Sequence, residues 1–243
     1  MNWYSYIYSS DDLTRGLQQL DHREKAWKQN ARIVLLLVNL MQVFQVVYIY
    51  YPYRLVQYFT NLTILATIFY QWVAILARRS PQNMSLLALH HLMFEIHFMM
   101  NFIVVVVFWS SLYGEAIADC HGDAFKIFNV WTGHTVPGIT ALINFLMTDC
   151  VFQLTHVKFV LSIGIFYGYI NYKETKRLGR PIYWFFTWED EKTFFLYGGF
   201  ILIFSFLWWL ICVTTLRMKP RPKAKAQTKR APASPNSKRS KLE

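Results

Sequence analysis

Apolar residues gather in six long runs along this chain, and short polar stretches separate the runs. A helix rises about 1.5 Å per residue, so roughly 20 apolar residues cross a hydrocarbon core about 30 Å thick. The pattern therefore predicts an all-α, polytopic integral membrane protein, built as a bundle of six transmembrane helices. The expected spans are residues 33–51, 55–77, 89–113, 130–152, 156–172 and 194–215.

The composition agrees with this pattern. Hydrophobic residues make up 54% of the 243 residues and aromatic residues 18%, whereas charged residues make up only 16%. A soluble domain usually has an apolar share of about 45–50%, so the excess indicates contact with lipid. The charged residues gather mainly near the two ends. We therefore expect an N-terminal cytosolic segment at residues 1–30, the six-helix transmembrane domain at residues 31–216 and a disordered, basic cytosolic tail at residues 217–243.

The basic residues predict the orientation, because the cytoplasmic flanks of membrane helices are enriched in Lys and Arg. Residues 217–243 carry ten basic residues and one acidic residue, which gives +9 of the formal net charge of +11. Six spans place both termini on the same side, so both are expected in the cytosol, with Arg78 and Arg79 in a cytosolic loop. The basic segment from Lys173 to Arg180 falls on the opposite side and disagrees with this arrangement.

The basic tail also predicts a location and a kind of partner. Its Lys and Arg residues suit contact with anionic lipid headgroups, whereas nucleic acid is not an expected partner of a chain threaded through a bilayer. The terminal sequence RSKLE is similar to a dibasic retrieval signal of the endoplasmic reticulum. We therefore expect an integral protein of the endoplasmic reticulum or the plasma membrane. Membrane lipids are the expected partners, and the sequence identifies no protein partner.

Polar side chains inside the expected spans are the candidates for chemistry. Such groups are costly in hydrocarbon and need partners, so each one is a possible functional residue. The candidates lie on the second, third and fourth spans: Thr60, Asn61, Thr63, Thr67, His90, His91, Glu95, His97, Asn101, His134, Asn144 and Asp149.

Thr60 and His134 are expected to lie at the same depth. Both of their spans run from outside to inside, with Thr60 about five residues into one and His134 about four into the other, some 6–8 Å below the outer end. Nucleophilic acyl transfer needs a hydroxyl beside an imidazole, because the neutral imidazole takes the hydroxyl proton during attack. Such a pair could cleave a lipid ester within the membrane.

Each of these two residues also has an ordinary structural interpretation. A threonine in a membrane helix usually donates its hydroxyl to the carbonyl one turn back. A histidine can pack between helices through hydrogen bonds. The sequence around His134 weakens the second interpretation, because Pro137 cannot donate to the Gly133 carbonyl and should kink the helix beside the imidazole. Glycine at 133 and 138 would allow another backbone or a ligand to come close.

Glu95 raises a second possibility, which is metal binding or a proton relay. Glu95 and His91 are four residues apart and share one face of a helix, whereas His97 points elsewhere. Because no other cluster with metal-ligand spacing faces them, we expect no bound metal and no cofactor. A structural pair or relay with Asp149 or His156, which share the depth of Glu95, is an equal alternative. A small transporter built on Glu95 and Asp149 would need an internal repeat of the kind many transporters have, and none is evident.

Three motifs resemble, in the same order, those of the androgen-induced membrane protein family. They are QYFTNLT at residues 57–63, WTGHTVP at 131–137 and GRPIYWFF at 179–186. The related rolling stone-like proteins share the general layout. Outside these motifs, the similarity over residues 35–210 is mainly one of hydropathy.

The resemblance implies both a fold and an activity. Members of the androgen-induced family have six spans and hydrolyse fatty acid esters of hydroxy fatty acids, with an intramembrane threonine as nucleophile and a histidine as its partner. Those roles fall on Thr60 and His134. Two positions depart from the family: Trp184 stands where a proline is usual, and Asn144 stands where relatives often carry an acid.

The leading hypothesis is thus a lipid ester hydrolase in which Thr60 is the nucleophile and His134 the general base. The alternative is a noncatalytic membrane organiser or a subunit of a membrane complex, of the rolling stone-like type. The missing acid and the basic tail favour this alternative.

Overall fold

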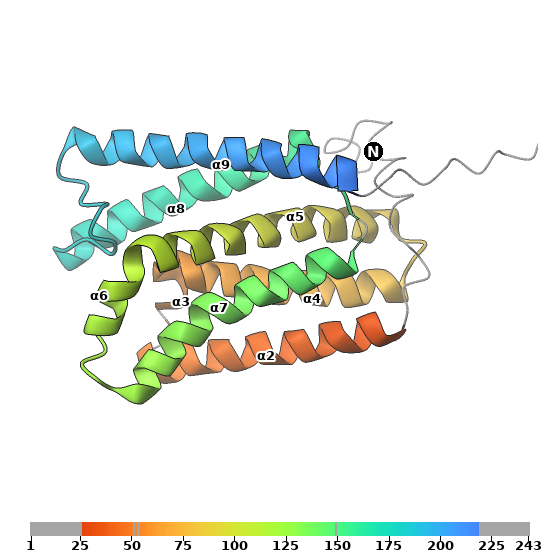
Figure 1. Cartoon of the computed structure of the whole chain (residues 1–243), viewed down its shortest axis with the longest axis horizontal. Helices are drawn as coiled ribbons and strands as arrows, with labels where there is room; N and C mark the ends of the chain where they lie inside the picture. The colour runs from red at the N-terminus through yellow and green to blue at the C-terminus, as the bar shows by residue number, and fades with distance from the viewer. Residues whose placement is uncertain (1–25, 51, 53, 149, 219–243) are drawn as a thin grey trace, which may run out of the picture.

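The computed structural model describes residues 26–50, 52, 54–148 and 150–218 (Figure 1). Most of the expected N-terminal segment and basic tail lie outside these residues, as does Asp149. Within them the chain forms helices and no strands, which confirms the all-α class. The elements are α2 (Ala26–Tyr50), α3 (Arg54–Gln57), α4 (Phe59–Arg79), α5 (Met84–Val107), the π-helix η2 (Phe108–Leu112), α6 (Tyr113–Ala118), α7 (Ala124–Met147), the 3₁₀-helix η3 (Leu154–His156), α8 (Val157–Leu178) and α9 (Glu191–Met218).

Each expected apolar run overlaps one long helix, although the boundaries differ: the second run also includes α3, and the third continues from α5 through η2. The first helix begins at Ala26 rather than at residue 33, and the last ends at Met218 rather than at 215. Among the described residues, four helical stretches are long and apolar enough to cross a membrane. These stretches are Ala26–Ile49, Phe59–Arg79, Met84–Ala118 and Glu191–Met218.

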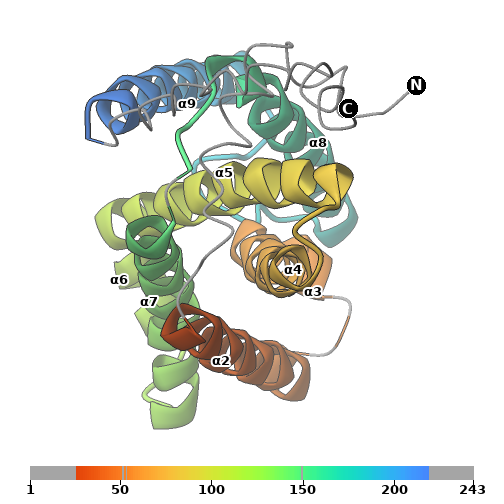
Figure 2. The same ribbon diagram turned by 90° about the vertical axis from the view of Figure 1, so that its right-hand side faces the viewer.

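The long helices form a bundle with α5 near its centre. Seen end-on, α8 and α9 lie together on one side of α5, while α4, α7 and α2 lie on the other (Figure 2). Helix α4 packs against α2, α5 and α7, helix α7 also packs against α2 and α5, and α8 packs against both α9 and α5. This arrangement brings α4 and α7, which carry Thr60 and His134, into direct contact.

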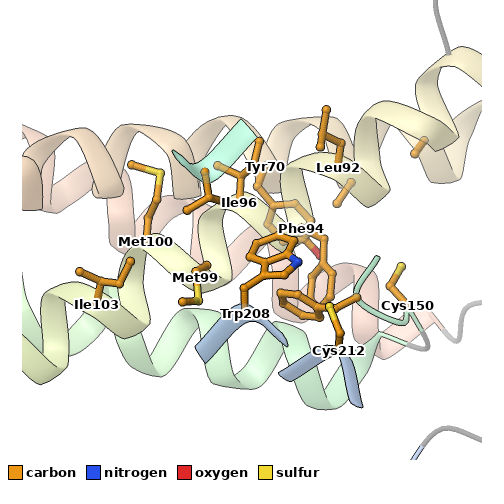
Figure 3. Close-up of a cluster of buried hydrophobic side chains, with 14 of the residues drawn as sticks. Tyr70, Leu92, Phe94, Ile96, Met99, Met100, Ile103, Cys150, Trp208 and Cys212 are labelled. Atoms are coloured by element: carbon orange, nitrogen blue, oxygen red, sulfur yellow. The ribbon is translucent and has the colours of Figure 1, made fainter. Parts of the chain in front are cut away.

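A cluster of buried apolar side chains fixes α5 against its neighbours. Phe94 and Met99 of α5 are fully buried and lie with Tyr70 of α4 and Trp208 of α9 (Figure 3). Close packing of such large aromatic side chains holds the helices together through many small dispersion contacts. The Trp208 indole N–H also donates to the Gln153 carbonyl at 3.0 Å, which satisfies its polar atom.

The close approach of α8 and α9 depends on a glycine. A Cβ on Gly168 would lie 2.6 Å from the phenol oxygen and ring of Tyr197. The Tyr197 hydroxyl donates to the Gly164 carbonyl one turn earlier on α8. Tyr197 therefore closes the space between these two helices, directly beside one of the cavities described below.

Candidate active site

Thr60 and His134 are in contact, as the sequence predicts. The Thr60 Oγ1 and His134 Nε2 atoms are 3.0 Å apart. Thr60 lies in the first turn of α4, and His134 lies near the middle of α7. A hydroxyl and a ring nitrogen at this distance form a hydrogen bond of ordinary length.

A backbone carbonyl determines which tautomer His134 adopts. The other ring nitrogen, Nδ1, lies 2.7 Å from the carbonyl oxygen of Val130, one turn back on α7. A carbonyl can only accept a hydrogen bond, so Nδ1 carries the proton. In the neutral ring, Nε2 then holds a lone pair and accepts a hydrogen bond from the Thr60 hydroxyl. This is the arrangement in which an imidazole can act as a general base.

Phe108 fixes the plane of the His134 ring. The two rings stack with centroids 3.6 Å apart and an interplanar angle of 11°. Phe108 is 1% exposed and begins the π-helix η2, where α5 departs from regular α-helical hydrogen bonding. Single π-helical turns inside α-helices occur often at functional sites. The irregular turn places an aromatic face against the imidazole.

The contact forms for a different reason from the one expected. The sequence placed Thr60 about five residues and His134 about four residues into their helices. In the structure α4 begins only at Phe59, after a bend at Tyr58, whereas α7 begins at Ala124. Thr60 is therefore the second residue of α4, whereas His134 is the eleventh residue of α7. The two side chains meet because the start of α7 extends well beyond the start of α4, and not because they lie equally far into their helices.

Two cavities meet at this pair of residues. A polar cavity of about 460 Å³ has a wall that includes Asn61, Lys126 and Arg180, and an apolar cavity of about 90 Å³ has a wall that includes Phe185 and Phe200. Five residues line both cavities: Thr60, Phe108, Leu112, His134 and Tyr183. The hydroxyl and imidazole thus face a polar space on one side and an apolar space on the other.

The two glycines beside His134 have different surroundings. Gly133 lines the polar cavity, and a Cβ built there meets no atom within 4 Å. A Cβ on Gly138 would instead collide with the Val105 side chain of α5. Gly138 therefore allows close helix packing, and α7 continues through Pro137 as one helix.

Two tyrosine hydroxyls cap the start of α4. The Phe59 N–H donates to the Tyr167 oxygen at 3.1 Å and to the Tyr183 oxygen at 3.2 Å. The Tyr167 hydroxyl in turn donates to the Gln57 carbonyl at 3.1 Å. These contacts tie α8 and the α8–α9 connection to the residue immediately before Thr60, and they hold its position.

Several other polar candidates form hydrogen bonds within the bundle. Thr63 donates to the Thr60 carbonyl at 2.7 Å, and Thr67 donates to the Thr63 carbonyl at 2.8 Å. The Asn101 amide donates to Thr67 Oγ1 at 2.7 Å. Asn144 donates to the Thr140 carbonyl at 2.8 Å and does not line either cavity. These side chains have the structural role that membrane helices usually give to threonine and asparagine.

Glu95 lies at the centre of a second buried polar group. Its carboxylate accepts from His156 Nδ1 and, at 2.5 Å, from the Gln153 N–H. His91 Nε2 lies 3.5 Å from the same carboxylate and 2.9 Å from the Val151 carbonyl. The alternative in which Glu95 pairs with His156 is therefore confirmed, and this group links α5 to the connection between α7 and α8.

His97 does not join the Glu95 group. Its Nδ1 faces the Phe94 carbonyl at 2.8 Å, and its ring stacks on Tyr70 with centroids 4.0 Å apart. Within the part of the chain that the structure describes, no group of three or more His, Cys, Asp or Glu residues is arranged to hold a metal ion.

The sequence reasoning missed the residues that orient Thr60 and His134. Val130 contributes its backbone carbonyl, which every residue has, so its side chain gives no signal in the sequence. Phe108 and Tyr167 are two aromatic residues among many, and nothing in the sequence distinguishes them. Tyr183 lies within the third of the three sequence motifs, at residues 179–186, which was a usable signal for a residue at the site.

Comparison with models of protein families, with curated proteins and with solved structures gives no match for this chain. The resemblance to the androgen-induced family therefore stays a prediction from three motifs, and the function has to be argued from the site itself.

Proposed function

We propose that this protein is an intramembrane lipid ester hydrolase in which Thr60 is the nucleophile and His134 the general base. The observation that carries the proposal is the 3.0 Å contact between these side chains at the place where a polar and an apolar cavity meet. The protein would have six spans, with α7 and α8 added to the four strongly apolar stretches, and both termini in the cytosol. The membrane would be the endoplasmic reticulum or the plasma membrane.

The reaction would proceed in two halves. The Thr60 oxygen attacks the ester carbonyl carbon while its proton passes to His134 Nε2, and the carbonyl electron pair moves onto oxygen. When the tetrahedral intermediate collapses, the ester bond breaks and the leaving alkoxide takes the proton from His134. Water then attacks the Thr60 ester with the same histidine as base, which releases the fatty acid and restores the hydroxyl.

The two cavities support a substrate with one apolar and one polar part. An acyl chain would enter the apolar cavity from the lipid, where the wall is almost entirely aromatic and aliphatic. The polar part would occupy the larger cavity, whose wall includes the cationic side chains of Lys126 and Arg180 together with the carboxylates of Glu115 and Asp119. A fatty acid ester of a hydroxy fatty acid fits this division, since it has a chain on one side of the ester and a carboxylate beyond the other.

The test is hydrolysis of such an ester by the purified protein in detergent or lipid nanodiscs. Thr60→Ala and His134→Ala are each expected to lower kcat about 10³-fold or more, because each removes a group that acts in the transition state. Thr214→Ala is the matched control, since this threonine is exposed on α9 and its hydroxyl bonds only the Leu210 carbonyl. Equal activity of the wild type and both site variants would exclude the proposal.

A noncatalytic membrane organiser or complex subunit is the second candidate. It is favoured by Asn144, where relatives often carry an acid and where the side chain bonds only within its own helix. A fluorophosphonate probe separates the two candidates. Labelling of the wild type that is lost in Thr60→Ala supports the hydrolase, and the absence of any labelling supports the organiser.

A further inference from the structure

The hydroxyl of Tyr183 contacts the backbone N–H of Phe59, the residue before the proposed nucleophile, and it donates no hydrogen bond to another described residue. Tyr183 lines both cavities together with Thr60 and His134. Its oxygen accepts the Phe59 N–H at 3.2 Å. The neighbouring Tyr167 hydroxyl donates to the Gln57 carbonyl at 3.1 Å.

The Tyr183 oxygen also lies 3.3 Å from the Tyr167 hydroxyl, which is the donor in this contact, and among the described residues Tyr183 itself donates no hydrogen bond. Hydroxyl hydrogen bonds usually measure about 2.5–3.0 Å, so this contact is weak. The Tyr183 hydroxyl can therefore turn toward a ligand at little cost. Burial also raises the pKa of this phenol above its ordinary value, so that it keeps its proton and remains a donor.

The backbone N–H of Thr60 is a second available donor. The first N–H groups of a helix have no partner within the helix. At the start of α4, the two tyrosine hydroxyls satisfy Phe59, while Asn61 and Leu62 donate to the Tyr58 carbonyl at 3.1 and 3.3 Å. Within the described part of the chain, the Thr60 N–H has no hydrogen-bond acceptor.

We propose that Tyr183 is a third catalytic residue, which donates its hydroxyl hydrogen bond to the ester oxygen while that oxygen carries negative charge. This inference rests on the proposed hydrolase function and supplies what that function lacks, a group to stabilise the oxyanion. The backbone N–H of Thr60 would be the second donor. Two donors aimed at one oxygen in a space shielded from water are the usual way in which acyl transfer is accelerated.

The hydrogen bonds leave the proton balance of the reaction unchanged. As Thr60 attacks, the carbonyl electron pair moves onto the oxygen, and Tyr183 and the Thr60 N–H share their protons with it without transferring them. When the intermediate collapses, the pair returns to form the carbonyl, and the leaving alkoxide takes its proton from His134. Tyr183 therefore acts identically in the attack by threonine and in the attack by water.

Tyr183→Phe is the direct test, because it removes one oxygen atom and leaves the ring in place. The Phe59 N–H keeps the Tyr167 oxygen as its acceptor, so the start of α4 should keep its structure. We expect kcat for the hydroxy fatty acid ester to fall about 10²-fold or more with KM nearly unchanged, as for the loss of one oxyanion donor. Phosphonylation of Thr60 by a fluorophosphonate should slow in parallel, because that adduct places an oxygen in the same position.

Three comparisons make the result specific. Tyr169→Phe should match the wild type, since that tyrosine is exposed on α8. Tyr167→Phe, which removes a capping hydroxyl, should lower the Tm more than Tyr183→Phe does. If Tyr183→Phe does not fold, 3-fluorotyrosine at position 183 provides the test, since it keeps the donor and should keep kcat.

The outcomes separate this inference from the proposed function. If the wild type hydrolyses the ester and Thr60→Ala does not, the hydrolase stands. A Tyr183→Phe protein that then keeps kcat within about threefold, or changes only KM, overturns the role of Tyr183 alone. A loss of kcat in the 3-fluorotyrosine protein would also overturn the role of Tyr183. A wild type without activity, or a fully active Thr60→Ala, overturns both.

Discussion

Two buried polar centres lie along α5, one at the middle of the helix and one just past its C-terminal end. Past the end, Phe108 stacks on His134, whose ring contacts Thr60. At the middle, Glu95 accepts hydrogen bonds from His156 and from the loop before it. The residues between Glu95 and Phe108 correspond to about 20 Å of helix at about 1.5 Å per residue. Both centres combine an imidazole with an oxygen, and they differ in their surroundings.

The difference lies in space and in hydrogen bonding. The Thr60 hydroxyl faces two cavities and has one side-chain partner. Glu95 is fully buried, lines neither of the two cavities described here, and accepts from both His156 and the backbone. A group that is enclosed and fully bonded stabilises a fold, whereas a group that faces a cavity can meet a substrate. Residue type alone does not distinguish the two.

Glu95→Ala is expected to give the largest loss of stability. The change leaves His156 and the Gln153 N–H without their carboxylate in a dry interior, and breaking such a buried pair costs about 3–5 kcal/mol. The apparent Tm of the purified protein in detergent should fall clearly. Thr60→Ala should instead keep the wild-type Tm while it loses ester hydrolysis.

Glu189→Ala is the control for this change, since that glutamate is exposed in the connection before α9 and should alter the Tm very little. A Glu95→Ala protein with the wild-type Tm would mean that the Glu95 group does not hold the bundle together. The contrast between the two centres would then fail.

A smaller effect is expected from Phe108→Leu. Leucine keeps much of the buried volume but removes the ring that stacks on His134 at 3.6 Å. A stacked pair contributes about 0.5–1.5 kcal/mol beyond the area it buries, so kcat should fall by up to about tenfold as the imidazole loses its fixed orientation. Phe102→Leu, at a partly exposed position on α5, should leave ester hydrolysis unchanged. Unaltered kcat in Phe108→Leu would show that the Val130 carbonyl orients the ring without help.

The sequence was a good guide to the helices and to the pair at the site. Long apolar runs located the long helices, because an extended apolar stretch without breaks is typical of one long helix. Thr60 and His134 were selected from twelve polar candidates by their expected shared depth and by the motifs around them. The all-α class and the contact between these two side chains could therefore be predicted.

The geometry around that pair could not be predicted, for a physical reason. The bend at Tyr58, which delays the start of α4, accompanies the tertiary contacts of Tyr167 and Tyr183 with the Phe59 N–H. The π-helix at Phe108 is likewise an irregular turn that no apolar pattern encodes. Both features depend on partners distant in sequence, and apolar periodicity carries no information about such partners.

Gly168→Ala is expected to have the smallest effect, and it tests the apolar cavity alone. A Cβ at this position would lie 2.6 Å from the Tyr197 phenol, so the ring must shift, and Tyr197 lines the apolar cavity of about 90 Å³. If the shifted ring costs a long acyl chain about 1 kcal/mol of contact, KM should rise about fivefold for long-chain esters. KM for short-chain esters and kcat for both should stay the same.

Gly198→Ala on α9 is the matched control for Gly168→Ala, because a Cβ there meets nothing within 4 Å. If KM rose equally for short and long esters, the apolar cavity would not be the place where the acyl chain lies. The polar cavity would then have to hold the whole substrate, and the division of the site into an apolar and a polar half would lose its basis.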